Sequence, residues 1–386
     1  MSGATGDAAT RRILLLAETF APGAAAEELV RWLAGRGHSM DVVAAEGTRA
    51  GEEQGWWRVE ERPGLRVTRC PRRRAYLPRG LGQHLQHASF ALSSAPVLLG
   101  RAQQFQPHLV AAVDPPAACL PALLLAARQA RAESWVHLGD TALLEKAALS
   151  RVRHVSLAAV GAAERLAEAG IDEGRRLPLL PWVDTRLVHP LTEPSALREA
   201  LSLPPDAIVA LYVGSLEQRQ GIERLLATAA RFPANGAVSF VLAGRGAAWQ
   251  HLLASTERLP LKLLPWPRAA HLNELLGLAD LHLLPAGADD PDALFPGKLA
   301  ALLASGRPVI SAGIVPAMLA KGVKGTPSHA EALASAIIEL AASPSERRRR
   351  GAAARQAAQE YFDKERVFRQ LEQRLGLRAP AAVAAS

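Results

Sequence analysis

Short apolar runs alternate with helical stripes along almost the whole chain. The first run, ILLLA at residues 13–17, has the length of a buried strand, and a helical stripe of Leu29, Val30, Trp32 and Leu33 follows it. Further strands are expected at residues 40–47, 65–70, 108–113, 134–139 and 155–161, with Ala- and Leu-rich helices between several of them. Strands that alternate with helices favour a parallel, doubly wound sheet. The first half is therefore predicted to be a Rossmann-like α/β domain.

A second series of the same kind follows a proline-rich connector. Six prolines lie between residues 177 and 205, and new strands are expected at 207–215, 238–246, 261–266, 280–286 and 307–313. Helices are expected at residues 330–342 and from about 345 to 375. We therefore predict a first domain at residues 1–185 and a second at 186–359, with a helix at about 360–380 packing back on the first. Two such halves suggest an enzyme whose ligand lies between them.

Length and composition narrow the class of protein. The 386 residues suffice for two domains, and 49 % hydrophobic with 21 % charged residues is the balance of a globular chain. No apolar run has the length of a membrane span, and the N-terminus lacks the order of a signal peptide. Two cysteines, Cys70 and Cys119, are too few for a disulfide framework. A cytoplasmic protein is expected.

The net charge of +8 is unevenly distributed. No acidic residue lies between Arg62 and Val113, whereas eight arginines stand from Arg62 to Arg101. Such a stretch attracts phosphate groups, and because no nucleic-acid motif accompanies it, nucleic acid is not the expected partner. The segment 81–105 that follows reads as a helical hairpin or a long helix. Two interpretations stay open, a helix lying against an anionic membrane surface or a solvated face over core helices. The candidate membrane and acceptor residues are Arg69, Arg72, Arg73, Arg74 and Arg79.

Three loops of the second domain offer anion-binding chemistry. Each follows a predicted strand and carries glycine near a cation: Gly214 with Arg219, Gly244 and Gly246 with Arg245, and Gly297 with Lys298. Glycine lets a phosphate approach the backbone, and the free N–H groups of a helix N-terminus, such as the one expected at Pro296, attract negative charge. Because the carboxyl ends of parallel strands share one edge of a sheet, the three loops together predict a nucleoside diphosphate site.

The order of these motifs resembles the retaining glycosyltransferases of family 4, and within it the colanic-acid-type exopolysaccharide enzymes. The resemblance rests on RCPRRRAYLP, LQHASFALSSAPVL, HLGD, YVGSLEQRQG, LFPGKLAALLASGRPVIS and DKERVFRQ, and it runs through nearly the whole chain. It implies the GT-B fold, two Rossmann-like domains that face a cleft. It also implies a nucleoside diphosphate sugar as donor, a polyprenyl-diphosphate-linked acceptor at the inner face of the cytoplasmic membrane, and transfer without a metal or other cofactor.

The resemblance assigns roles to individual positions. His137 matches a histidine near the reacting sugar, with Asp140 close by, and Arg219 stands one residue before the position of a usual lysine. The catalytic candidates are His137, Arg219 and Lys298. Trp266 and Pro267 would flank the nucleobase, and Asp292 would contact sugar hydroxyls. The full donor-binding set is Gly23, Gly214, Ser215, Gly244, Arg245, Trp266, Pro267, Asp292, Pro296 and Gly297.

Several departures from the family pattern support an alternative. The paired glutamates of the family, eight residues apart, are replaced by Ala293 and Ala301, and the chain is short between Asp140 and Val155. The DPD sequence ending at Asp292 has the form of a metal motif, but that motif belongs to another glycosyltransferase fold. A non-catalytic paralogue that acts as a partner or scaffold in the same pathway is therefore the second hypothesis.

Overall fold

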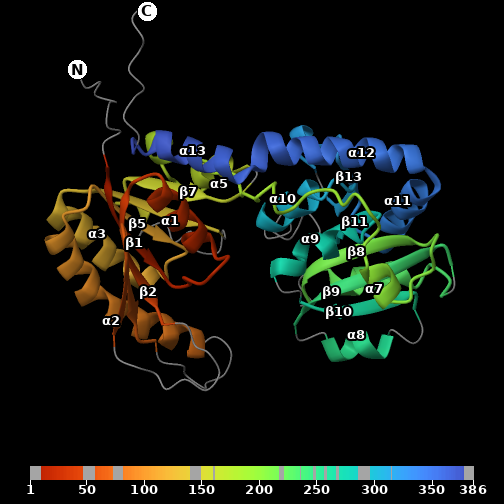
Figure 1. Ribbon diagram of the computed structural model, residues 1–386, viewed down its shortest axis with the longest axis horizontal. Helices are drawn as coiled ribbons and strands as arrows, with labels where there is room; N and C mark the ends of the chain where they lie inside the picture. Colours follow the sequence, from red (N-terminus) through yellow and green to blue (C-terminus); the bar gives the residue numbers. More distant parts are fainter. Residues whose placement is uncertain are drawn as a thin grey trace, which may run out of the picture. The chain divides into compact units, whose positions relative to one another are not determined.

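The chain forms two α/β units (Figure 1). The computed structural model describes residues 10–46, 57–72, 81–139, 149–159, 161–216, 221–234, 236–246, 249–255, 259–266, 269–285, 296–313 and 315–377. The first unit contains the described residues up to Leu179 and those from Phe368 onward, and the second runs from Leu180 to Val367.

The first unit is built on a seven-stranded sheet in the order β3-β4-β2-β1-β5-β6-β7. Its strands are β1 (Arg12–Ala17), β2 (Ser39–Ala45), β3 (Arg58–Arg62), β4 (Leu65–Cys70), β5 (Leu109–Val113), β6 (Glu133–Leu138) and β7 (His154–Leu157). All neighbours are parallel except β3 and β4, which form an antiparallel edge. The helices are α1 (Ala25–Gly35), α2 (Leu81–Phe105), α3 (Leu120–Ala130) and α5 (Ala162–Glu168). The sequence did not predict β3, because its charged side chains do not alternate with apolar ones.

The second unit has a six-stranded, wholly parallel sheet in the order β10-β9-β8-β11-β12-β13. The strands are β8 (Ile208–Ser215), β9 (Val238–Arg245), β10 (Leu261–Pro265), β11 (Leu281–Leu284), β12 (Val309–Ala312) and β13 (Val323–Thr326), of which β13 was not predicted. Renumbered from β8, this is the 3-2-1-4-5-6 order of the Rossmann fold, and the first unit has the same order once β3 is set aside. In this fold ligands bind beyond the carboxyl ends of the strands, where the strand order reverses. That point lies at β8 and β11.

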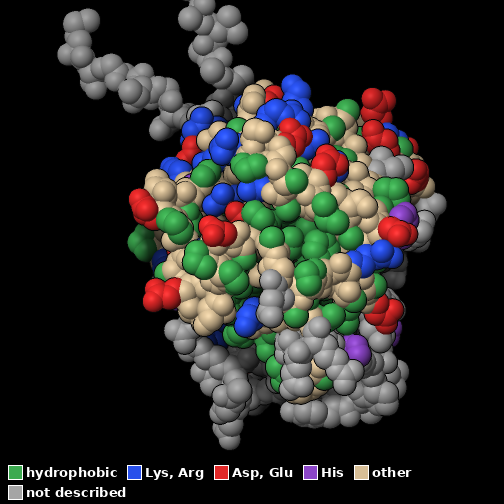
Figure 2. Space-filling model, turned by 90° about the vertical axis from the view of Figure 1, so that its right-hand side faces the viewer, with side chains coloured by type: hydrophobic (Ala, Val, Ile, Leu, Met, Phe, Trp, Pro, Cys, Tyr) green, Lys and Arg blue, Asp and Glu red, His purple; other side chains and the backbone are tan. Residues whose placement is uncertain are grey.

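Helices connect and cover the second sheet. They are α6 (Leu197–Ala200), α7 (Ile222–Ala229), α8 (Trp249–Ser255), α9 (Leu272–Gly277), α10 (Pro296–Ala304), α11 (Ala330–Ala342) and α12 (Pro344–Ala357). The core residues Ile222, Leu225, Leu333 and Ile337 bring α7 and α11 onto the buried side chains of β8 and β9. Charge is mixed on the face that Figure 2 shows, where basic and acidic side chains surround a central group of hydrophobic ones. The positive net charge therefore does not form a continuous basic patch on this face.

The end of the chain differs from its prediction. The helix expected from about 345 to 375 is interrupted after α12 by a π-helical turn at Ala358–Phe362, and Asp363 is extended before α13 (Lys364–Arg374) begins. The division between units lies at Leu179–Leu180 instead of 185–186, because Val183 donates its N–H to Phe362 (2.8 Å) and Thr185 bonds Asp363 (2.5 Å). The return to the first unit occurs at Phe368, later than the expected residue 360.

Candidate donor site of the second unit

The carboxyl end of β8 packs against the end of β9 so closely that only glycine fits. A Cβ on Gly244 would overlap the carbonyl oxygen of Gly214, and one on Gly246 would overlap the carbonyl oxygen of Leu216. The two strands stay paired through Ser215 and Arg245, the last residues of each. The glycines therefore bring two strand ends side by side at the point of the fold where ligands bind.

Lys298, in the first turn of α10, reaches back to this point. A Cβ on Gly214 would overlap its ammonium group, which shows that Nζ lies directly against the backbone of β8. Nζ also lies 4.0 Å from the centre of the Tyr212 ring. Burial lowers the pKa of Lys298 to about 7. In the part of the chain that the structure describes, no carboxylate pairs with this half-buried ammonium.

Behind Lys298, a buried histidine joins β11 to α10. His282 Nε2 lies 3.0 Å from Ser305 Oγ, and Ser305 donates its own proton to the Leu302 carbonyl at 2.6 Å, so His282 is the donor. Burial, reinforced by the charges of Arg307 and Lys298, lowers the pKa of His282 to about 3. The imidazole is therefore neutral and fixes the end of α10 to the sheet.

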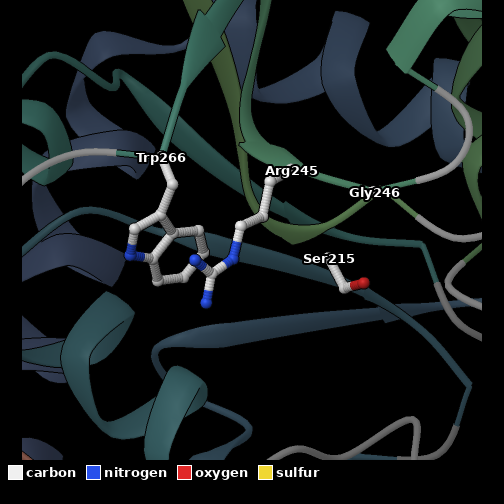
Figure 3. A pocket seen from close by; sticks show the side chains of 4 residues that line it. All are labelled: Ser215, Arg245, Gly246 and Trp266. Carbon is white, nitrogen blue, oxygen red and sulfur yellow. The ribbon is translucent and has the colours of Figure 1, made fainter. Parts of the chain in front are cut away.

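A pocket of about 500 Å³ opens beside the two strand ends, a volume typical of small-molecule sites. The described residues that line it are Ser215, Arg245, Gly246 and Trp266. Figure 3 shows the side chains of Arg245 and Trp266 extending from their strands to the same side. Trp266, directly after β10, is 48 % exposed, which is unusual for a large aromatic side chain. A flat apolar surface, a guanidinium and a helix N-terminus thus stand at one sheet edge.

The structure brings together Gly214, Ser215, Gly244, Arg245 and Trp266, and it places Lys298 and the N-terminus of α10, where Pro296 and Gly297 stand, at the same strand ends. Arg219, Pro267 and Asp292 lie outside the described residues, as do Asp140 and Ala293. Gly246, which the sequence singled out together with Gly244, lines the pocket. Tyr212 and His282 were not predicted from the sequence, because an aromatic residue and a histidine inside buried strands look like ordinary core.

His137, predicted from the first domain, is a buried residue at the end of β6. Its Nδ1 lies 2.9 Å from Ser156 Oγ, which also accepts a hydrogen bond from Trp135 Nε1 at 2.8 Å. The Ser156 hydroxyl itself donates to the Val136 carbonyl at 3.5 Å. Burial lowers the pKa of His137 to about 4, against the opposing effect of Asp114. At neutral pH His137 is therefore uncharged and cannot act as an imidazolium acid.

The remaining first-domain candidates have mainly local partners. Gly23 has a φ of +81° in an exposed turn before α1, a conformation that favours glycine. Arg69 pairs with Glu60 at 2.9 Å, and Arg72 pairs with Glu18 at 2.8 Å. Acidic residues from β3 and the end of β1 thus compensate part of the basic stretch. Arg73, Arg74 and Arg79 lie outside the described residues.

Membrane spans and metal clusters are both absent from the described segments. Their helices include none long and apolar enough to cross a bilayer. Segment 81–105 is a single helix, α2, with Pro96 inside it. Among the same residues, no group of three His, Cys, Asp or Glu side chains is arranged to hold a metal ion.

Comparison with known proteins identifies the class. Residues 21–160 match the family described as "Glycosyl transferase 4-like domain", and residues 207–343 match "Glycosyl transferases group 1". The chain belongs to these glycosyltransferases, and its fold is GT-B. Sucrose-phosphate synthase from Thermosynechococcus elongatus superposes with a TM-score of 0.77 at 19 % identity, over 94 % of this chain and 98 % of that one. HepE from Anabaena, solved in complex with UDP and glucose, gives 0.70 at 18 % identity, over 95 % and 99 %.

One relative carries a more specific name than the matched families. The chain is 26 % identical over 384 residues to WcaI of Escherichia coli (strain K12), whose name assigns it to colanic acid biosynthesis, and the match covers 89 % of this chain and 93 % of WcaI. The family and fold that the sequence motifs implied are thereby confirmed.

Proposed function

We propose that this glycosyltransferase moves a sugar from a nucleoside diphosphate sugar to a lipid-linked oligosaccharide in exopolysaccharide assembly, with retention of configuration and without a metal. The observation that carries the donor assignment is the Lys298 ammonium. It lies against Gly214 at the end of β8, where the next residue, Ser215, lines the pocket, and no described carboxylate neutralises it. A diphosphate would supply the missing negative charge.

The same groups suit the chemistry of transfer. Negative charge develops on the leaving diphosphate as the bond to the sugar breaks, and fixed positive groups at that place lower the barrier. Lys298 and the N-terminus of α10 supply such groups, and Arg245 lies on the neighbouring strand end. The exposed ring of Trp266 offers a surface for the nucleobase. HepE, solved with UDP and glucose, supports a nucleotide-sugar donor.

The lipid-linked acceptor rests on kinship with WcaI and on the surface of α2. Leu85 and Leu92 stand seven residues apart on this helix, on one face, and are 47 % and 78 % exposed. Such a face suits peripheral association with an anionic membrane. Sedimentation with vesicles containing phosphatidylglycerol tests this: Leu92→Glu should weaken binding, whereas Leu125→Glu on α3, also exposed, should leave it unchanged.

The donor assignment is tested by calorimetric titration of the whole protein with UDP and GDP, first without metal and then with magnesium. We expect micromolar binding of one nucleotide, and the same affinity when magnesium is added. If affinity appears only with magnesium, the metal-independent mechanism is wrong. Transfer from the matching nucleotide sugar, with NMR of the product's anomeric proton, then decides between retention and inversion.

The alternative is a non-catalytic paralogue that binds a partner in the same pathway. It is favoured by Ala301, which stands on α10 where the family carries a glutamate, and by Ala293. This alternative predicts that neither nucleotide binds, or that a nucleotide binds but no sugar is transferred.

A further inference from the structure

Tyr212 in β8 is a buried aromatic residue that contacts more than the core. It is 1 % exposed and belongs to the apolar cluster of the second unit, yet its ring faces the Lys298 ammonium at 4.0 Å. Its hydroxyl donates to the Ser215 carbonyl at 2.7 Å, which ties the ring to the end of its own strand. One side chain thus joins the charge of α10 to the strand end that lines the pocket.

The ring stabilises the ammonium without neutralising it. The negative face of an aromatic ring attracts a cation, and the attraction grows where water is excluded. A carboxylate in the same place would pair with Lys298 and compete with any incoming anion. The ring holds the ammonium in position without supplying a counter-ion.

We propose that Tyr212 is a positioning residue of the donor site, whose ring holds the Lys298 ammonium against Gly214 so that it meets the phosphate groups of the ligand. This inference rests on the proposed function, because it takes the anion at Lys298 to be the donor diphosphate. It extends that function by making the π-face of a core residue part of the phosphate site.

Phosphate binding at this position is coupled to a proton. Burial lowers the pKa of Lys298 to about 7, and a bound anion would raise it again. The described groups that interact with Lys298 do not titrate in the same range: burial raises the pKa of Tyr212, and burial lowers the pKa of His282 to about 3. Asp289, Asp290 and Asp292 lie outside the described residues. Binding at pH 8 should therefore take up close to one proton.

The experiment varies the electron density of the ring at nearly constant size. Tyr212→Phe is the reference, and 4-fluoro-, 3,5-difluoro- and 3,4,5-trifluorophenylalanine are then placed at position 212 of the full-length protein. Each fluorine weakens the negative face of the ring, so affinity should fall stepwise, by about tenfold across the series. The same fluorinated phenylalanines placed at position 240 are the matched control, because Phe240 is fully buried in β9 with its ring edge-on to Phe232. Equal affinity throughout the 212 series would overturn the proposal.

Two probes separate this inference from the proposed function: the nucleotide and inorganic pyrophosphate. Proton uptake is obtained at pH 8 from calorimetry in buffers of different ionisation enthalpy, and Lys298→Arg should abolish it. If pyrophosphate affinity follows the fluorine series but no nucleotide binds, the ring positions the lysine and the donor assignment is wrong. If a nucleotide binds with the same affinity throughout the series, the donor assignment stands and the role of Tyr212 is wrong. If neither probe binds, both are overturned.

Discussion

At the scale of single residues, the site is defined by a lysine that no described carboxylate pairs with. Lysine is almost never buried without a partner, because desolvation penalises the ammonium. Lys298 nevertheless lies at the end of β8. The Tyr212 ring contacts its ammonium group, and the lack of a side chain on Gly214 leaves room for it. Such an arrangement lowers the stability of the free protein, and the lost stability is recovered when an anion binds.

Lys298→Met should therefore weaken nucleotide binding and stabilise the fold. We expect at least a tenfold loss of affinity and a gain of about 1 kcal/mol or more in the free energy of unfolding at pH 7. Because the folded state holds fewer protons on Lys298 than the unfolded state above pH 7, this residue makes wild-type stability rise with pH up to about 10, and the variant should lack that slope. Lys324→Met, which removes a lysine paired with Glu339 at 2.7 Å, is the control. A destabilised Lys298→Met protein would contradict the prediction.

Two buried histidines predict a loss of stability in mild acid. His137 and His282 have pKa values of about 4 and 3, so between pH 6.5 and 4 the unfolded chain binds protons that the folded one does not. Each histidine should lower the free energy of unfolding by about 2 kcal/mol between pH 7 and pH 5. In urea unfolding at these two pH values, His137→Gln and His282→Gln should each reduce the loss by that amount, and the double variant should combine the two reductions. A pH dependence equal to wild type would show that the rings bind a proton in the folded protein as readily as in the unfolded chain.

The sequence singled out most of the residues that the structure places at these strand ends, but not the residues that support them. Glycine followed by arginine can be recognised in a sequence, because it interrupts the apolar run of a buried strand. Tyr212 is not visible in this way, because a tyrosine in an apolar strand is typical core. Its contact with Lys298 joins positions 86 residues apart, and only the fold reveals it.

At the scale of elements, buried parallel strands were predictable and the exceptions have physical causes. Strands covered on both faces read as continuous apolar runs, as in β1, β5 and β8. The edge strand β3 carries RVEER, whose charges pair with Arg66 and Arg69 of β4 instead of facing a core. The break before α13 contains no glycine or proline, so no sequence signal marked it.

The paired strand ends predict a contrast between two glycines. Gly244→Ala should destabilise the second unit by several kcal/mol, because the new Cβ meets the backbone carbonyl of Gly214, which cannot move away without separating β8 from β9. Gly100→Ala, inside α2 where a Cβ meets nothing within 4 Å, should stabilise by about 0.5–1 kcal/mol. Urea unfolding of both variants checks the prediction. Equal effects would mean that the two strand ends can separate enough to admit a methyl group.

At the scale of the whole molecule, the first unit is completed by a distant part of the chain. Phe368 lies edge-on to Trp32 of α1, with ring centres 5.4 Å apart, and the Arg36 guanidinium lies over the Trp32 ring, 5.3 Å from its centre. Glu372, buried, accepts from Arg36 at 3.3 Å and lies 3.2 Å from His38. The sequence predicted that a C-terminal helix returns to this unit, but not these partners.

Phe368→Ala should act on the first unit alone. Removing a fully buried phenylalanine costs about 3–5 kcal/mol, and the ring that would lose its neighbour, Trp32, belongs to α1. Hydrogen exchange should accelerate in β1 and β2 while β8 and β9 keep their protection. Phe240→Ala, equally buried in the second unit, should give the reverse pattern. Exchange that accelerates equally in both sheets would show that the units do not unfold separately.

The late return of the chain also bears on synthesis. Residues from Phe368 onward leave the ribosome after the second unit, so that unit, which ends at Val367, can finish folding while the first still lacks the partners of Trp32 and His38. Until then the apolar surface of α1 has no cover from the C-terminal helix. The first unit is thus synthesised before the second but completed after it, and during that interval the uncovered face of α1 is a surface that a chaperone can bind.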